Sequence, residues 1–265
     1  MEKVNIHDHG FVTLVDKMGS DESIENAARI SYGDGTREKT ETEGLIRYLM
    51  RHRHTSPFEM CEVVFHLKLP IFVMRQLVRH RTASLNEYSG RYSEMSSDFY
   101  VPSREYLRKQ SETNKQGRSD ATLGNVGLLQ YEYNRSHDTS HIAYQNLLRE
   151  DVAREIARAV LPVSNYTEVI WKSDLHNFFH MVSLRSDTHA QQEIRDYSDA
   201  MYEIVKPLFP ISCQAFEDYV LNGVTFSQEE MRIIRDKLDG SWTMSDYNLT
   251  KRERTEFLEK IKNER

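Results

Sequence analysis

The chain has 265 residues, 38% of them hydrophobic and 29% charged, and its formal net charge at pH 7 is -6. This length and apolar content fit one large globular domain, or a domain with a short appendage, and argue against a disordered chain. The acidic total argues against an extended basic surface for duplex nucleic acid. With two cysteines and no long apolar run at the N-terminus, we expect a soluble cytoplasmic protein without a signal peptide or a membrane span.

Two amphipathic helices are predicted first. Residues 20–32 and 40–54 each repeat apolar side chains at the spacing of one helix face, and Ser20 and Ser23 can cap the first of these helices. Residues 62–70 then alternate apolar and polar side chains, which is the period of a strand.

A third helix is predicted to follow this strand directly. Pro70 ends the strand, and proline fits the first turn of a helix, so we expect residues 70–81 to be helical. Gln76, Arg79 and His80 then fall on the polar side of this helix, because they lie three and four residues apart.

The second half of the chain is predicted to be mainly helical. Residues 103–120 are polar without an apolar period, which indicates a solvated loop or a helical excursion. The remaining elements are a helix over 133–150, another from 152 that Pro162 terminates, a strand over 165–171, and a long helical pattern over 173–210 interrupted near 185–189. Capping boxes of Ser227 with Glu230 and of Thr250 with Glu253 predict two short charged helices at the C-terminal end.

Three catalytic arrangements are disfavoured by their spacing. Neither Cys61 nor Cys213 lies in a nucleophile signature, so both are interpreted as small buried residues. His176 and His180 have the spacing of a helical zinc pair, but Asn177 stands where a metalloprotease has glutamate, and no third ligand is fixed, so no metal is expected. The stretch GDGTRE does not follow a strand and lacks the third glycine of a dinucleotide-binding motif.

The segment RHRTASLNEYSGRY, residues 79–92, is the strongest candidate site. Its arginines and His80 are interleaved with residue types that favour turns. Gly90 permits close backbone approach, Ser89 offers a neutral donor, and Arg91 offers a planar fork, so the segment predicts a phosphate and nucleobase cradle. Two alternatives remain: a solvated turn whose arginines pair with surface carboxylates, or a short basic run that grips nucleic-acid phosphates.

This segment resembles the signature of the flavin-dependent thymidylate synthases, which is Arg-His-Arg, seven residues, Ser and a nearby Arg. The stretches HTSPFEM at 54–60, REIARAVLP at 154–162 and LRSDTHAQQEI at 184–194 are also similar to that family, so the resemblance spans roughly residues 5–220. It implies a methyltransferase that makes dTMP from dUMP. The carbon donor would be methylenetetrahydrofolate, the hydride source FAD, and the reductant of FAD would be NADPH.

The resemblance also implies roles for individual residues. Arg185 and His54 would act in catalysis, Arg185 by favouring ionisation at N3 of the uracil. The dUMP-binding positions would be Gln76, Arg79, Glu87, Tyr88, Ser89, Gly90, Arg91, Arg158 and Arg185. The FAD-binding positions would be Ser56, Arg79, His80, Arg81, Glu87, Asp174, Leu175, His176 and His180. The run Asp174-Leu175-His176 departs from the Asn-x-Arg that members often carry.

The family resemblance also implies an architecture. The fold would be α/β (α+β), with a curved mixed or antiparallel sheet flanked by helices, over residues 1–220. A helical C-terminal extension of unknown role would follow over 221–265. The family assembles as homotetramers whose active sites lie between subunits, and its partners are small molecules rather than nucleic acid or a membrane. Two other functions remain to be tested: a nucleotide- or flavin-binding protein without turnover, and a small nucleic-acid-binding module.

Overall fold

The computed structural model describes residues 3–30, 42–238 and 251–262. The chain divides into two compact units, Met1–Phe216 and Glu217–Arg265. No helix among these described ranges is long and apolar enough to cross a membrane.

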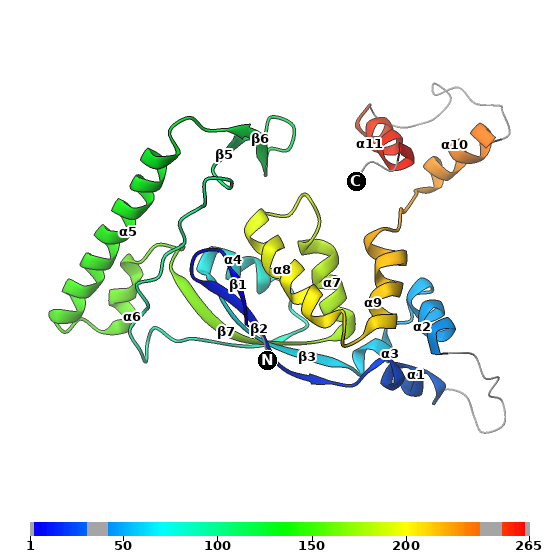
Figure 1. Ribbon diagram of the computed structural model, residues 1–265, viewed down its shortest axis with the longest axis horizontal. Helices are drawn as coiled ribbons and strands as arrows, with labels where there is room; N and C mark the ends of the chain where they lie inside the picture. Colours follow the sequence, from blue (N-terminus) through cyan, green and yellow to red (C-terminus); the bar gives the residue numbers. More distant parts are fainter. Residues whose placement is uncertain (1–2, 31–41, 239–250, 263–265) are drawn as a thin grey trace. The chain divides into compact units, whose positions relative to one another are not determined.

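The centre of the first unit is a five-stranded sheet (Figure 1). Its strands, in spatial order, are β1 (Lys3–Ile6), β2 (Gly10–Met18), β3 (Glu62–Pro70), β7 (Tyr166–Asp174) and β4 (Ser84–Glu87). Every neighbouring pair in this sheet is antiparallel, and the register of β2 against β3 shifts between Leu14 and Asp16. The predicted antiparallel sheet is therefore confirmed.

The two strands predicted from the sequence, β3 and β7, are the two most buried. In β3, the alternate residues Val63, Phe65 and Leu67 are completely buried, as the period of two predicts. The other three strands, β1, β2 and β4, were not predicted from the sequence. The four residues of β4 are all exposed at the edge of the sheet, so its sequence has no alternation of burial to reveal it.

Helices lie beside the sheet, and two of them continue directly from strands β3 and β7 (Figure 1). They are α1 (Asp21–Arg29), α2 (Thr42–Arg51), α3 (Ser56–Glu59), α4 (Ile71–Leu77), α7 (Leu175–Arg185), α8 (Gln192–Val205) and α9 (Pro210–Phe216). The helix predicted after Pro70 is confirmed but ends at Leu77, so Arg79 and His80 lie just beyond it. The interruption predicted near 185–189 is also confirmed, because it separates α7 from α8.

The segment between β4 and β7 differs most from expectation. It contains a two-stranded hairpin of β5 (Arg108–Gln110) and β6 (Arg118–Thr122), then α5 (Val126–Arg149), α6 (Arg154–Ala157) and a short 3-10 turn (Arg158–Val160). The hairpin lies where a loop or helical excursion was predicted. Its side chains bond to backbone carbonyls, for example Arg108 to Asp120 and Gln110 to Gly117, instead of packing in an apolar layer.

The second unit contains a π-helical turn (Glu217–Leu221), α10 (Gln228–Leu238) and α11 (Lys251–Lys262). The capping box of α10 is confirmed: the Ser227 amide donates to Glu230 Oε2 at 2.7 Å, and the Glu230 amide donates to Ser227 Oγ at 3.3 Å. Ile233 and Phe257 form its buried apolar cluster. Thr250, the cap predicted for the last helix, lies outside the described residues.

Candidate functional site

The ends of α4 and α7 meet at a pair of side chains. Arg185, the last residue of α7, donates from Nε to Nε2 of His80 at 2.9 Å and from Nη2 to the carbonyl oxygen of Gln76 at 3.3 Å. A cavity of about 290 Å³ lies here, and its lining residues are Arg79, His80, Arg81, Thr82, Asn177, His180, Leu184 and Arg185. One histidine-arginine contact therefore brings five of the residues predicted to bind nucleotide or flavin to one cavity.

His80 is a neutral hydrogen-bonding group in this cavity. Burial first, and then the positive charge of Arg185 and the neighbouring His180, lower the pKa of His80 from 6.5 to about 4. Because Nε2 accepts from Arg185, the proton of the neutral ring is on Nδ1. Burial also lowers the pKa of Arg185, yet a guanidinium remains charged at neutral pH. The cavity thus combines a fixed cation with a neutral imidazole donor.

The signature segment joins the sheet before it turns. Glu87 is the last residue of β4, and its Oε1 accepts a hydrogen bond from Thr167 Oγ1 of β7 at 2.9 Å. The amides of Tyr92 and Ser93 both donate to the carbonyl of Ser89, which closes a tight turn after the strand. The Tyr88 hydroxyl donates to the carbonyl of Glu94 at 2.6 Å.

Gly90 allows this turn to lie against Arg158. A Cβ atom at position 90 would lie 2.6 Å from Met95 Sδ and 3.1 Å from Cδ of Arg158, closer than side chains normally pack. Arg91 forms an ion pair with Glu155 at 3.2 Å, in which both side chains are more than half exposed. The structure therefore brings Gly90, Arg91 and Arg158 together in a second group of predicted residues.

The two groups are separate within one chain. No hydrogen bond or ion pair among the described residues joins the cavity group around Arg185 to the turn group around Arg91. Most of the charged members, including Arg79, Arg81 and Arg158, are exposed.

Several predicted residues have structural contacts of their own. Asp174 is the N-cap of α7, where its oxygens accept from the amide and side chain of Asn177 at 2.9 and 2.8 Å. Leu175 is fully buried, and its amide donates to the carbonyl of Cys61. The Leu175 side chain therefore belongs to the core, and the Asp174 side chain holds the start of a helix.

The remaining predicted residues lie outside the cavity lining. His54 is exposed beside the rings of Tyr48 and His52, with centroid distances of 5.7 and 6.5 Å. Ser56 is exposed at the start of α3, and His176 is partly buried in the first turn of α7.

Both cysteines are thiols inside the protein. Burial raises the pKa of Cys61 from 9.0 to about 11, and Cys213 is also completely buried. No group of three potential metal-ligating side chains occurs in the described part of the chain.

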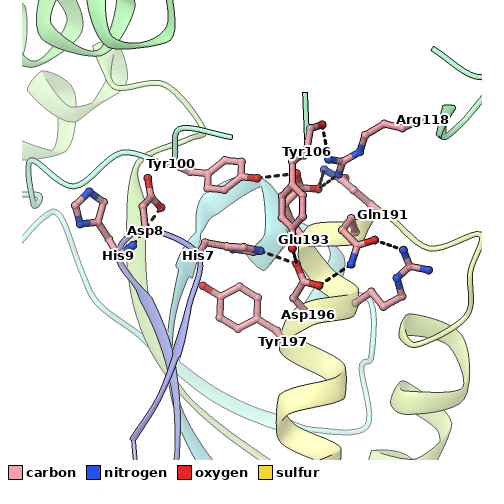
Figure 2. A network of polar contacts seen from close by, with 12 residues as sticks. His7, Asp8, His9, Tyr100, Tyr106, Arg118, Gln191, Glu193, Asp196 and Tyr197 are labelled. Carbon is pink, nitrogen blue, oxygen red and sulfur yellow. Dashed lines mark hydrogen bonds and ion pairs between the residues drawn. The ribbon is translucent and has the colours of Figure 1, made fainter. Parts of the chain in front are cut away.

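Sequence reasoning missed a buried polar network at the start of α8 (Figure 2). Glu193, 3% exposed, accepts from Tyr100 at 2.9 Å and pairs with Arg118 at 2.5 Å. Asp196 accepts from Tyr106 at 2.7 Å and lies 2.8 Å from the ring of His7. Glu193 lies in the stretch 184–194, which was singled out only for its similarity to the family. Its partners Tyr100 and Arg118 lie in distant segments that no local sequence pattern connects to it.

Comparisons with known proteins find similar sequences over most of the chain. A family model described as "Thymidylate synthase complementing protein" matches residues 13–211. A protein of Treponema denticola named flavin-dependent thymidylate synthase is 46% identical, and the match covers 100% of this chain and 98% of that protein. A protein of the same name from Thermus thermophilus is 50% identical, with 89% and 86% covered.

Solved structures are similar to this chain as well. The UMP/dUMP methylase PolB from Streptomyces cacaoi, bound with 5-Br UMP, superimposes with a TM-score of 0.74 at 35% identity. The match covers 82% of this chain and 98% of PolB. The same enzyme bound with 5-Br dUMP gives a TM-score of 0.74 at 34% identity. Together with the signature segment and the family model, these similarities show that the chain belongs to the flavin-dependent thymidylate synthase family.

Proposed function

We propose that this protein methylates dUMP to dTMP, with methylenetetrahydrofolate as the carbon donor and NADPH-reduced FAD as the source of hydride. Family membership supports the reaction, and the similar methylase PolB is bound with pyrimidine nucleotides. The observation that carries the proposal is the contact of Arg185 with neutral His80 inside a cavity that Arg79 and Arg81 also line. This arrangement offers fixed positive charge to an anionic nucleotide and its ring.

Arg185 is proposed to be the catalytic cation. Its guanidinium is oriented by His80 and by the Gln76 carbonyl, so its position is fixed before a ligand arrives. A permanent cation beside N3 of uracil would stabilise negative charge that develops on the ring. His54, which the family resemblance also assigns to catalysis, is proposed to act from its exposed position after α2.

The turn group is proposed to hold the nucleotide phosphate. Arg91 and Arg158 supply guanidinium forks, and Ser89 and Gly90 supply the compact backbone between them. Binding of phosphate would replace the exposed Arg91–Glu155 ion pair with a charge-assisted contact. Gln76, Arg79, Glu87 and Tyr88 complete the proposed dUMP positions.

The donor set also fits a flavin. Arg79, Arg81 and His180 line the cavity, and the proton on His80 Nδ1 makes that ring a donor at neutral pH. When bound, FAD supplies the hydride that completes the methyl group. In the stretch that departs from the family pattern, His176 is the proposed side-chain contact, since Asp174 caps α7 and Leu175 is in the core. Ser56 and Glu87 stay proposed contacts.

A homotetramer is proposed to complete the site. The exposure of the arginines and the separation of the cavity group from the turn group within one chain support active sites formed between subunits. Residues 1–220 would form the catalytic domain and 221–265 an extension of unassigned role. The cytoplasmic location expected from the sequence is part of the same proposal.

The test is an assay of dTMP formation from dUMP with the purified full-length protein. We expect product only when FAD, NADPH and methylenetetrahydrofolate are all present. Replacement of dUMP by UMP tests whether this chain shares the broader substrate range named for PolB. Tight flavin binding without dTMP formation would instead support a binding protein without turnover, and salt-sensitive oligonucleotide binding would support a nucleic-acid module.

A further inference from the structure

A chain of hydrogen bonds connects Gln76 to the buried network of α8. Gln76 Nε2 donates to Gln191 Oε1 at 2.7 Å, and Gln191 Nε2 donates to Glu193 Oε2 at 2.9 Å. Glu193 in turn pairs with Arg118 of the β5–β6 hairpin at 2.5 Å and accepts from the hydroxyl of Tyr100. A predicted nucleotide-binding side chain is thus connected to a buried carboxylate through one intervening amide.

The carboxylate of Glu193 fixes which group donates in each of these two amide hydrogen bonds. An ionised carboxylate can only accept, so Gln191 must turn its NH₂ group toward Glu193. The side-chain carbonyl oxygen of Gln191 then faces Gln76, and Gln76 must donate to it from its own NH₂ group. The amide orientation of Gln76 follows from this order.

We propose that Gln191 and Glu193 are positioning residues that hold Gln76 with its carbonyl oxygen turned toward the nucleotide. Gln76 Oε1 has no partner among the described residues, so it is left to accept from an N–H or O–H group of a ligand. A phosphate dianion, which only accepts, cannot fill this role. The inference rests on the proposed function, since it takes dUMP as the ligand of Gln76.

The hairpin and the segment before it contact the buried end of this hydrogen-bonded series Gln76–Gln191–Glu193, which we call the relay. Arg118 donates from Nη1 to the carbonyl of Tyr106 at 2.8 Å while its Nη2 contacts Glu193, and the Tyr106 hydroxyl bonds to Asp196 one turn further along α8 (Figure 2). One contact from the hairpin and one from Tyr106 just before it therefore join this part of the chain to the first turns of α8. The segment that sequence patterns described only as polar becomes the support of a ligand-facing amide.

The test is a binding cycle measured by calorimetry on the FAD-loaded, full-length protein. The ligands are dUMP, an analogue methylated at N3 and an analogue without the 3′-hydroxyl, so that each analogue lacks one donor. The parent is compared with Gln191→Leu, which breaks the relay at an exposed residue and leaves the Glu193–Arg118 pair intact. Gln192→Leu is the matched control, since the neighbouring Gln192 amide bonds to Asp196 instead of Gln76.

In the parent, loss of the donor that faces Gln76 should weaken binding about three- to tenfold, the range for one neutral hydrogen bond. In Gln191→Leu this penalty should largely disappear, while Gln192→Leu should retain it. Equal penalties in all three proteins for both analogues, in a parent that forms dTMP, would overturn the relay alone. A parent that binds no dUMP would overturn the proposed function together with the relay.

Discussion

Arg185 and His80 form a pair in which Nε of the arginine donates a hydrogen bond to Nε2 of the histidine. The bond from Arg185 Nε to His80 Nε2 is 2.9 Å long, and the same guanidinium also reaches the carbonyl of Gln76. A protonated His80 would have no lone pair at Nε2 for this bond and would add a second positive charge beside the first. The pair therefore links the charge state of a histidine to the position of the proposed catalytic cation.

Arg185→Ala should remove most of the turnover while FAD remains bound. Loss of a preorganised charge beside the uracil is expected to lower kcat by about 100-fold or more. The measurements are dTMP formation and the flavin absorbance of the purified variant. Arg195→Ala is the control, because Arg195 lies on α8 beside Gln192 and outside the cavity lining. A colourless Arg185→Ala variant, or one as active as the parent, would contradict the assignment.

The pair also predicts how stability depends on pH. The pKa of His80 is about 4 in the folded protein and 6.5 in the reference state, so between these values the unfolded chain binds a proton that the folded chain does not. The contribution of His80 to the free energy of unfolding is thus complete above pH 6.5 and is lost as the pH falls toward 4.

His80→Asn should remove that contribution to the pH dependence. Urea unfolding at about pH 5 and about pH 7 should show a smaller difference between the two conditions in the variant than in the parent. The exposed His189 provides the control, His189→Asn. If the parent and His80→Asn lose stability equally on acidification, His80 is not the residue that resists protonation.

Gly90→Ala should weaken nucleotide binding without unfolding the protein. The added methyl group would lie 2.6 Å from Met95 Sδ and 3.1 Å from Arg158 Cδ, so both side chains must move, and both are flexible enough to do so. Displacement of Arg158 should lower dUMP affinity about tenfold. Gly127→Ala is the matched control, since a Cβ there meets nothing within 4 Å. An unchanged dUMP affinity in calorimetry would show that Arg158 does not bind the phosphate of dUMP.

The double variant Cys61→Ser, Cys213→Ser should still form dTMP. Both thiols are buried, and the raised pKa of Cys61 disfavours a thiolate at neutral pH. A buried hydroxyl in place of a thiol can cost about 1–3 kcal/mol when it has no partner, so folding is checked independently by thermal unfolding. Loss of all activity in a folded, FAD-loaded variant would require a cysteine in the reaction.

The sequence predicted those parts of the fold in which local chemistry and burial agree. The alternation over 62–70 reports a strand buried on one face, and Pro70 marks the start of α4 because its ring suits a first helical turn. The exposed edge strand β4 and the polar hairpin carry no such periodicity. The structure of β4 depends on its pairing with β7, and that of the hairpin on bonds from Gln110 and Arg118 to the backbone carbonyls of Gly117 and Tyr106.

The family resemblance located the candidate site, whose residue assignments stay predictions, whereas the contacts that these residues make within the chain were not predictable from it. Asp174 was predicted to bind FAD, and the structure uses its carboxylate to cap α7. Leu175 was assigned to FAD as well, and its side chain packs in the core. Gln191 and Glu193 lie in the stretch LRSDTHAQQEI, and no role was predicted for either residue. The contacts of Glu193 with Tyr100 and Arg118 depend on residues that lie far apart in sequence, for which local spacing contains no signal. The Asp174 cap is local, because Asn177 lies only three residues further along the chain.

The convergence of α4 and α7 has an electrostatic consequence. Both helices end at the cavity, so the partial negative charge at their C-terminal carbonyls points toward it, as the bond from Arg185 to the Gln76 carbonyl illustrates. A helix N-terminus attracts anions, whereas this arrangement repels them until cations are added. The arginines at 79, 81 and 185 therefore reverse the sign of the local potential. Neutralising one of them would weaken the positive potential that an incoming anion meets at the carbonyl ends of these two helices.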